Sequence, residues 1–172
     1  MIPSRLHLLP NALTASRLVL AVAFPWLPAG WRFAAIGIAA VTDFLDGFLA
    51  RRLRAESEFG RLLDPVADKE FVLVLVGTLI AERALDPWWG LAVAVRDVVV
   101  LAGVVWVAAR RRWAAARGMR AKWLGKVTTA AQFAVLLVLV GAGSAPVWLL
   151  AVTAALSAAA AVDYARGFVG HP

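Results

Sequence analysis

The sequence predicts an all-α integral membrane protein with six transmembrane helices. Three observations lead to this class. Of the 172 residues, 62% are hydrophobic and only 17% are charged, whereas soluble domains contain about 25% charged residues. Mostly apolar segments of about 20 residues, the length that crosses a bilayer, recur along the chain. Lys and Arg are concentrated in alternate connections between these segments.

The expected helices follow one another through residues 1–172 as a single membrane domain. They span residues 11–27, 31–54, 61–81, 87–109, 125–140 and 146–169. Pro10 and Asn11 provide a start for the first helix. No stretch is long enough for a second core, and the absence of cysteine excludes disulfides and thiolate chemistry. Residues 1–14 lack the ordered features of a signal peptide.

The basic residues orient the chain in the membrane. Most of them flank the second–third and fourth–fifth connections or lie near the termini: Arg5, Arg51, Arg52, Arg54, Arg61, Arg110, Arg111, Arg112, Arg117, Arg120, Lys122 and Arg166. By the positive-inside rule, both termini and these connections are expected to be cytoplasmic, as on a bacterial inner membrane protein. Tryptophans fall near the expected outer ends as interfacial anchors: Trp31, Trp88, Trp89 and Trp148. The net charge of +7 then favours anionic lipid headgroups and phosphorylated ligands as partners, and no nucleic acid.

Four aspartates lie where a membrane protein rarely places them. Asp43 and Asp46 are three residues apart on the second expected helix, and Asp64 and Asp68 are four apart on the third, so each pair shares a helical face. The short connection between these helices makes them antiparallel, which allows the carboxylates to converge on one cavity at the cytoplasmic boundary. An ionised Asp at mid-bilayer costs about 2.5–3.5 kcal/mol on insertion scales. An interfacial salt-bridge network is one explanation, and a bound divalent cation is the favoured one, because oxygen-only ligands suit Mg²⁺ or Mn²⁺.

Small and basic residues surround the aspartates. Gly47 and Ala50 leave a groove without side chains, which either admits a ligand to the backbone or lets helices pack closely. Gly60 is expected to form the turn into the third helix. Arg51 is placed either to meet a phosphate oxygen or to extend its side chain toward the headgroups.

These residues resemble a known family. The pattern Asp-x2-Asp-Gly-x2-Ala-Arg-x8-Gly-x3-Asp-x3-Asp is the signature of the CDP-alcohol phosphotransferases. Every spacing of it is intact at Asp43, Asp46, Gly47, Ala50, Arg51, Gly60, Asp64 and Asp68. The flanking segments PNALTASR (10–17), LLDPVADK (62–69) and WLGKVTTAAQ (123–132) look like those of phosphatidylglycerophosphate synthases and cardiolipin synthases.

The resemblance implies a six-helix fold that dimerises, with a polar cavity open to the cytosol. CDP-diacylglycerol is expected to bind there with its diphosphate on Mg²⁺ or Mn²⁺. Asp43, Asp46 and Asp64 would be the main metal ligands, and Asp68 would complete the metal site and act as general base. The residues expected around the nucleotide and diphosphate are Asp46, Gly47, Ala50, Arg51, Gly60 and Asp64. An acceptor hydroxyl then attacks the phosphorus that carries diacylglycerol, and CMP leaves.

The expected acceptor is glycerol 3-phosphate, with phosphatidylglycerol as the alternative, as in cardiolipin synthases. Arg96 and Lys126 are candidates to bind an acceptor phosphate, although Arg96 is equally well explained as a structural partner of Asp97. Arg17 and Thr14 are further candidates, with lipid or packing contacts and helix capping as their alternatives. The synthases that the chain resembles tend to read Gly-Lys-x-Lys-Thr at the start of the fifth helix, whereas this sequence reads GKVTT over residues 125–129.

A function of another class also fits intramembrane acids. A small cation transporter could use the aspartates to coordinate its cargo. Transporters often show inverted repeats and helices broken near the midplane. The sequence shows neither, and its acids cluster toward one membrane face, so the transferase is favoured.

Overall fold

The computed structural model describes residues 8–53, 60–109 and 123–169, and this part of the chain contains helices and no strand. Its α-helices are α1 (Leu8–Ala23), α2 (Ala29–Leu53), α3 (Gly60–Ala81), α4 (Pro87–Ala109), α6 (Trp123–Ala142) and α7 (Val147–Val169). A short 3₁₀ helix, η1 (Phe24–Trp26), follows α1. The six-helix, all-α architecture is therefore confirmed.

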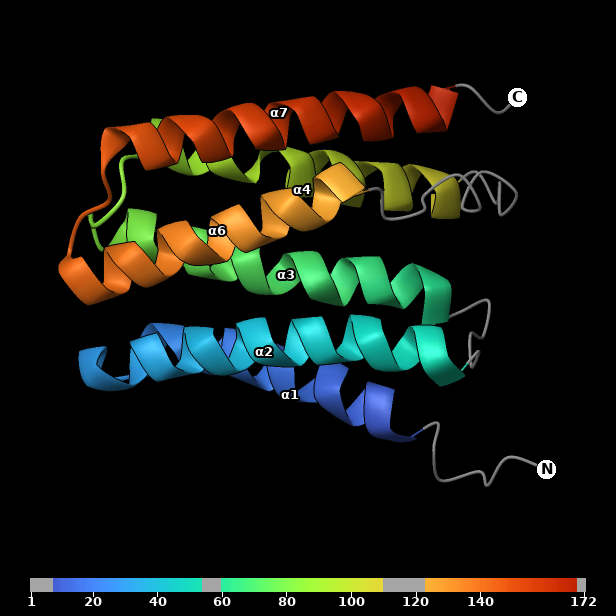
Figure 1. Cartoon of the computed structure of the whole chain (residues 1–172), viewed down its shortest axis with the longest axis horizontal. Helices are drawn as coiled ribbons and strands as arrows, with labels where there is room; N and C mark the ends of the chain where they lie inside the picture. The colour runs from blue at the N-terminus through green and yellow to red at the C-terminus, as the bar shows by residue number, and fades with distance from the viewer. Residues whose placement is uncertain (1–7, 54–59, 110–122, 170–172) are drawn as a thin grey trace.

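The helices lie side by side and alternate in direction along the chain (Figure 1). The start of α1, the end of α2, the start of α3, the end of α4, the start of α6 and the end of α7 all lie at one end of the bundle. We call this the basic end, because most Lys and Arg residues of the sequence flank these positions. Helix α1 packs against α2 and α3, α4 packs against α3 and α7, and α6 packs against α2, α3 and α7.

Local chemistry sets the helix boundaries at the opposite end. The carboxylate of Asp86 accepts a hydrogen bond from the backbone N–H of Trp88 at 2.8 Å and caps α4, which begins at Pro87. Pro146 precedes α7, and its carbonyl accepts the N–H of Leu149 at 3.0 Å.

The first helix was expected to continue to residue 27, and this boundary is wrong: α1 ends at Ala23, and Pro25 lies in the 3₁₀ turn.

The core fills the space between α1, α2, α3, α4 and α6 with apolar side chains. Phe24, Ile36, Phe71, Leu75 and Leu136 are among its fully buried residues. The rings of Phe71 and Phe133 lie 6.1 Å apart between centroids in a tilted arrangement, which joins α3 to α6.

The protein is a membrane protein by the length and apolarity of its helices. Three stretches of the described chain are long and apolar enough to cross a bilayer: Pro87–Trp106, Trp123–Ala142 and Val147–Gly167. Shorter apolar helical stretches run over Ser16–Trp26 and Ala29–Thr42. Helix α3 begins with a segment rich in charge, residues 60–70, and is in neither group. Crossing by α1, α2 and α3, and the cytoplasmic position of the termini, stay predictions.

Four exposed tryptophans lie at the end opposite the basic end, whereas Trp123, 79% exposed, begins α6 at the basic end. Trp26, Trp31, Trp88 and Trp148 are each more than 60% exposed and lie in η1 or in the first turns of α2, α4 and α7. We call this the tryptophan end. The position of these side chains agrees with the expected role of interfacial anchors. Trp89 differs, because it is partly buried and packs against the core.

An ion pair joins α2 to the residue that follows α3 at the tryptophan end. Arg32 donates to both carboxylate oxygens of Glu82, at 2.5 and 2.7 Å. It also donates to the carbonyls of Leu27 and Pro25, and its guanidinium lies 5.3 Å from the centroid of the Phe24 ring. The hydrogen bonds from Arg32 hold the pKa of the Glu82 carboxyl below its ordinary value.

Candidate functional site

The residues of the aspartate pattern lie on two helices near the basic end. Helix α2 carries Asp43, Asp46, Gly47, Ala50 and Arg51, and α3 begins at Gly60 and carries Asp64 and Asp68. The side chains of these residues lie outside the part of the chain that the structure describes, so their convergence and their roles stay predictions. Gly60, expected in a turn, is the first residue of α3.

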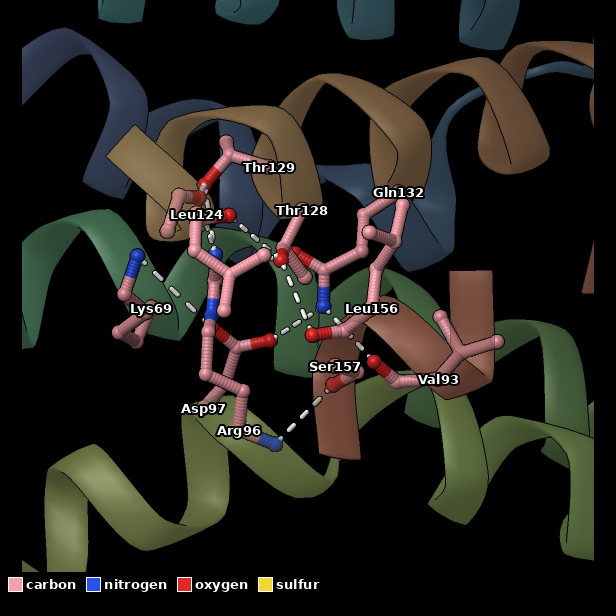
Figure 2. A network of polar contacts seen from close by, with 11 residues as sticks. Lys69, Val93, Arg96, Asp97, Leu124, Thr128, Thr129, Gln132, Leu156 and Ser157 are labelled. Carbon is pink, nitrogen blue, oxygen red and sulfur yellow. Dashed lines mark hydrogen bonds and ion pairs between the residues drawn. The ribbon is translucent and has the colours of Figure 1, made fainter. Parts of the chain in front are cut away.

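A buried ion pair lies on α4 and has partners on α3, α6 and α7 (Figure 2). Asp97 is 0% exposed and Arg96 is 1% exposed. Oδ1 of Asp97 accepts hydrogen bonds from Nη2 of Arg96 at 2.6 Å and from its Nε at 3.1 Å. A buried charge without a partner costs several kcal/mol, so each member of this pair depends on the other.

Helix α6 completes the coordination of both charges. Nη1 of Arg96 donates to the backbone carbonyl of Gly125 at 2.5 Å and to the hydroxyl of Thr129 at 3.0 Å. Gln132 bridges the pair: its Oε1 accepts from Nη2 of Arg96 at 3.0 Å, and its Nε2 donates to Oδ2 of Asp97 at 2.5 Å. Nε2 of Gln132 also donates to the carbonyl of Val93 at 2.9 Å. The pair therefore links α4 to the first three turns of α6.

Helix α3 reaches the same carboxylate through a lysine. Nζ of Lys69 lies 3.7 Å from Oδ1 of Asp97, and the Lys69 side chain is only 14% exposed. Figure 2 shows the Lys69 side chain pointing from α3 toward Asp97. Lys69 directly follows Asp68 in the sequence. The network thus extends to the helical turn that carries the expected general base.

Helix α7 closes the network on its remaining side. The backbone N–H of Arg96 donates to the hydroxyl of Ser157 at 3.1 Å. The fully buried hydroxyl of Thr128 lies 2.8 Å from the carbonyl of Leu124 and 3.3 Å from that of Leu156. Thr128 therefore packs α6 against α7.

The four acceptor-site candidates occupy different environments. Each donor nitrogen of Arg96 has an acceptor within the protein, which supports its structural pairing with Asp97 and leaves its acceptor role a prediction. Lys126 is exposed in the first turn of α6, beside Gly125. Arg17 is buried on α1. Thr14 is on α1, and its side chain lies outside the described residues.

Sequence reasoning did not predict the roles of Thr129 and Gln132. Gly125, Thr129 and Gln132 are separated by four and three residues, so they share one face of α6. Such a polar stripe in an otherwise apolar helix was the available signal.

Among the described side chains there is no group of three or more His, Cys, Asp or Glu that could hold a metal, and the side chains of the four aspartates lie outside the described residues.

Comparison with known proteins gives consistent matches. The family model described as CDP-alcohol phosphatidyltransferase matches residues 7–160. The chain is 39% identical over 139 residues to the CDP-diacylglycerol–glycerol-3-phosphate 3-phosphatidyltransferase of Escherichia coli (strain K12), and the alignment covers 74% of each chain. The proteins of the same name from Shigella flexneri serotype 5b and Shigella boydii serotype 4 show the same identity and coverage.

Proposed function

Because this chain belongs to the CDP-alcohol phosphatidyltransferase family and is a transferase, we propose that it moves the phosphatidyl group of CDP-diacylglycerol to glycerol 3-phosphate and releases CMP. The observation that carries the proposal is the 39% identity, over 74% of both chains, to proteins that bear the name of this reaction. The intact spacing of the eight-residue pattern on α2 and α3 supports the same chemistry.

A divalent cation fits the chemistry of the donor residues. The expected ligands are carboxylates only. The second half of α2 and the first half of α3 carry them, and these halves lie toward the same end of the bundle (Figure 1). Magnesium is commonly held by one or two carboxylates together with substrate phosphates. We therefore assign Mg²⁺ or Mn²⁺ to Asp43, Asp46, Asp64 and Asp68. When bound, the metal would neutralise the diphosphate and stabilise charge on the leaving oxygen.

The remaining roles belong to the protein. Asp68 takes the proton of the acceptor hydroxyl, a contribution typically worth about 10²–10⁴ in rate. The hydroxyl oxygen forms a bond to the phosphorus that carries diacylglycerol, and the bond from that phosphorus to the bridging oxygen breaks, so that CMP departs with that oxygen. Gly47, Ala50 and Gly60 frame the nucleotide, and Arg51 meets the diphosphate. No covalent enzyme intermediate is needed.

The acceptor phosphate is assigned to cations near the basic end. Lys126 is exposed in the first turn of α6, which leaves its ammonium accessible to a ligand. A second candidate acceptor is phosphatidylglycerol, because residues 125–129 read GKVTT and lack the second lysine of the Gly-Lys-x-Lys-Thr pattern. The active site is expected to face the cytosol, and the protein is expected to form a homodimer in the membrane.

Release of CMP from CDP-diacylglycerol tests the proposal. The purified protein, in detergent–lipid micelles with Mg²⁺, is given glycerol 3-phosphate, phosphatidylglycerol or no acceptor. We expect rapid CMP release with glycerol 3-phosphate, and loss of release in EDTA with recovery on adding Mg²⁺ or Mn²⁺. Faster turnover with phosphatidylglycerol would transfer the assignment to cardiolipin synthesis. No CMP release with any acceptor would refute phosphatidyl transfer.

A further inference from the structure

The carboxylate of Asp97 is the point where three helices of the bundle meet. It is 0% exposed and lies near the middle of α4. Its partners come from α4 itself (Arg96), from α6 (Gln132) and from α3 (Lys69). Such a group is expensive to bury, because an ionised carboxylate in a low-dielectric interior loses several kcal/mol of solvation. Arg96 alone could neutralise it, so charge balance does not explain the contacts with α3 and α6.

The contacts to α6 fix the start of that helix. Arg96, oriented by Asp97, donates to the carbonyl of Gly125 at 2.5 Å and to Thr129 at 3.0 Å. Lys126 directly follows Gly125, so the same hydrogen bonds determine where Lys126 leaves the bundle. A shift of Arg96 would therefore move the cation that we assign to the acceptor phosphate.

The contact to α3 reaches the turn that carries the aspartates. Nζ of Lys69 lies 3.7 Å from Oδ1 of Asp97, a separation for charge attraction rather than a direct hydrogen bond. Lys69 directly follows Asp68 and lies five residues after Asp64 on the same helix. Because an α-helix is stiff over two turns, attraction of Lys69 toward α4 restrains the backbone at both aspartates.

We propose that Asp97 is a positioning residue for phosphatidyl transfer, which holds the Asp64–Asp68 turn of α3 and the Lys126 turn of α6 in a fixed relation. The proposal rests on the proposed function. It assigns Asp97 no contact with substrate. Asp97 affects the rate because the general base and the acceptor phosphate must be held in a fixed relation. A misplacement of about 1 Å can lower the reaction rate by as much as 10²-fold.

A double-mutant cycle on Asp97 and Lys69 tests this role in the full-length protein. Asp97→Asn keeps the shape of the side chain and removes its charge, and Lys69→Met removes the cation while leaving the bonds of Arg96 and Gln132 in place. We expect each variant to lower kcat roughly 10- to 100-fold. The KM for CDP-diacylglycerol should change by less than about threefold, since uniform substrate binding is not altered. Adding Lys69→Met to Asp97→Asn should slow turnover no further, because the contact between Lys69 and Asp97 is already lost in the Asp97→Asn variant.

Two controls separate positioning from loss of stability. Thr153→Val alters another fully buried polar residue, on α7, whose hydroxyl has no hydrogen-bond partner among the described residues, and it should leave kcat unchanged. Leu139→Ala opens a cavity in the core and should cost about 2–5 kcal/mol of stability. Equal loss of kcat in Leu139→Ala at a matched loss of Tm would overturn the positioning role, as would multiplicative effects of Asp97→Asn and Lys69→Met.

The outcomes also separate this inference from the proposed function. A wild-type protein that releases no CMP refutes phosphatidyl transfer, and the positioning role is overturned with it. An active wild type with an equally active Lys69→Met variant refutes the positioning role alone. If Asp97→Asn does not fold, Gln132→Met removes the hydrogen bond to Oδ2 of Asp97 instead, and full kcat in that variant contradicts the proposal.

Discussion

Gly125 offers a sharp test of how α6 meets α7. A Cβ added at this buried position would lie 3.0 Å from the hydroxyl oxygen of Tyr164, and 3.6 and 3.8 Å from its Cε2 and Cζ. Only the hydroxyl is closer than ordinary van der Waals contact. Gly125→Ala gains up to about 1 kcal/mol of helix propensity. Adding a methyl to a packed site costs about 1–3 kcal/mol, so we expect a net loss of about 0–2 kcal/mol.

Removing the hydroxyl should reverse the sign of this effect. In a Tyr164→Phe background the nearest remaining contacts are the ordinary ones at 3.6 and 3.8 Å. Gly125→Ala should then raise the free energy of unfolding by about 0.5–1 kcal/mol, because only the propensity gain remains. The two substitutions should therefore couple by about 1–3 kcal/mol in the stabilising direction.

Unfolding in mixed micelles with increasing SDS measures all four proteins of this cycle. CMP release should follow the same pattern, because displacing the Gly125 carbonyl disturbs its hydrogen bond from Arg96 and the adjacent Lys126. A coupling free energy below about 0.5 kcal/mol, within the usual error of additivity, would refute the proposed contact between Gly125 and Tyr164.

Three further predictions concern the aspartates, the tryptophan end and the close approach of α3 to α4. Asp68→Asn should reduce kcat by about 10²–10⁴ while equilibrium binding of CDP-diacylglycerol persists, and near-normal turnover would exclude Asp68 as the base. The hydrogen bonds from Arg32 hold the pKa of Glu82 below its ordinary value of 4.5. The ion pair therefore stabilises the fold at pH values above 4.5, and this stabilisation is lost as pH falls through the lowered pKa. The Tm difference between wild type and Glu82→Gln should thus be constant near neutral pH and shrink below about pH 4.5, and a difference that grows on acidification would contradict the pairing. A Cβ at position 90 would lie 2.5 Å from Cδ1 of Ile80, so Gly90→Ala should lower Tm. Ile80→Val removes that atom and should recover part of the loss, since Cγ1 of Ile80 and Cγ1 of Val76 remain at 3.1 and 3.2 Å. Equal Tm loss in both backgrounds would show that Gly90 and Cδ1 of Ile80 do not meet.

Much of the fold followed from the sequence because hydrophobic segment length and basic connections are local properties. The fourth helix was expected over the residues that α4 occupies, and the third and sixth differ from α3 and α7 by one residue at one end. The first helix was misjudged because its apolar run continues through Pro25, where the backbone changes from α to 3₁₀ geometry. Apolarity persists across that change, so composition alone did not mark it.

The site was predictable only in part. Spacing placed the aspartates on two sequence-adjacent helices, and α2 and α3 confirm that placement, while the geometry of their side chains stays a prediction. The sequence left Arg96 and Asp97 between a structural and a functional role. The contacts that hold this pair could not be predicted, because Gln132 and Lys69 are 36 and 27 residues away from Arg96 in the sequence. Pairing between such distant helices depends on their rotation about their own axes, which periodicity does not determine.

The ion pair of Arg32 and Glu82 has a consequence for motion. It fastens the first turns of α2 to the residue after α3 at the tryptophan end, and α1 packs along both helices. The aspartates are carried toward the other extremity of the same two helices. Any separation of α2 from α3 is therefore restrained at the tryptophan end and is largest toward the basic end, where the aspartates lie.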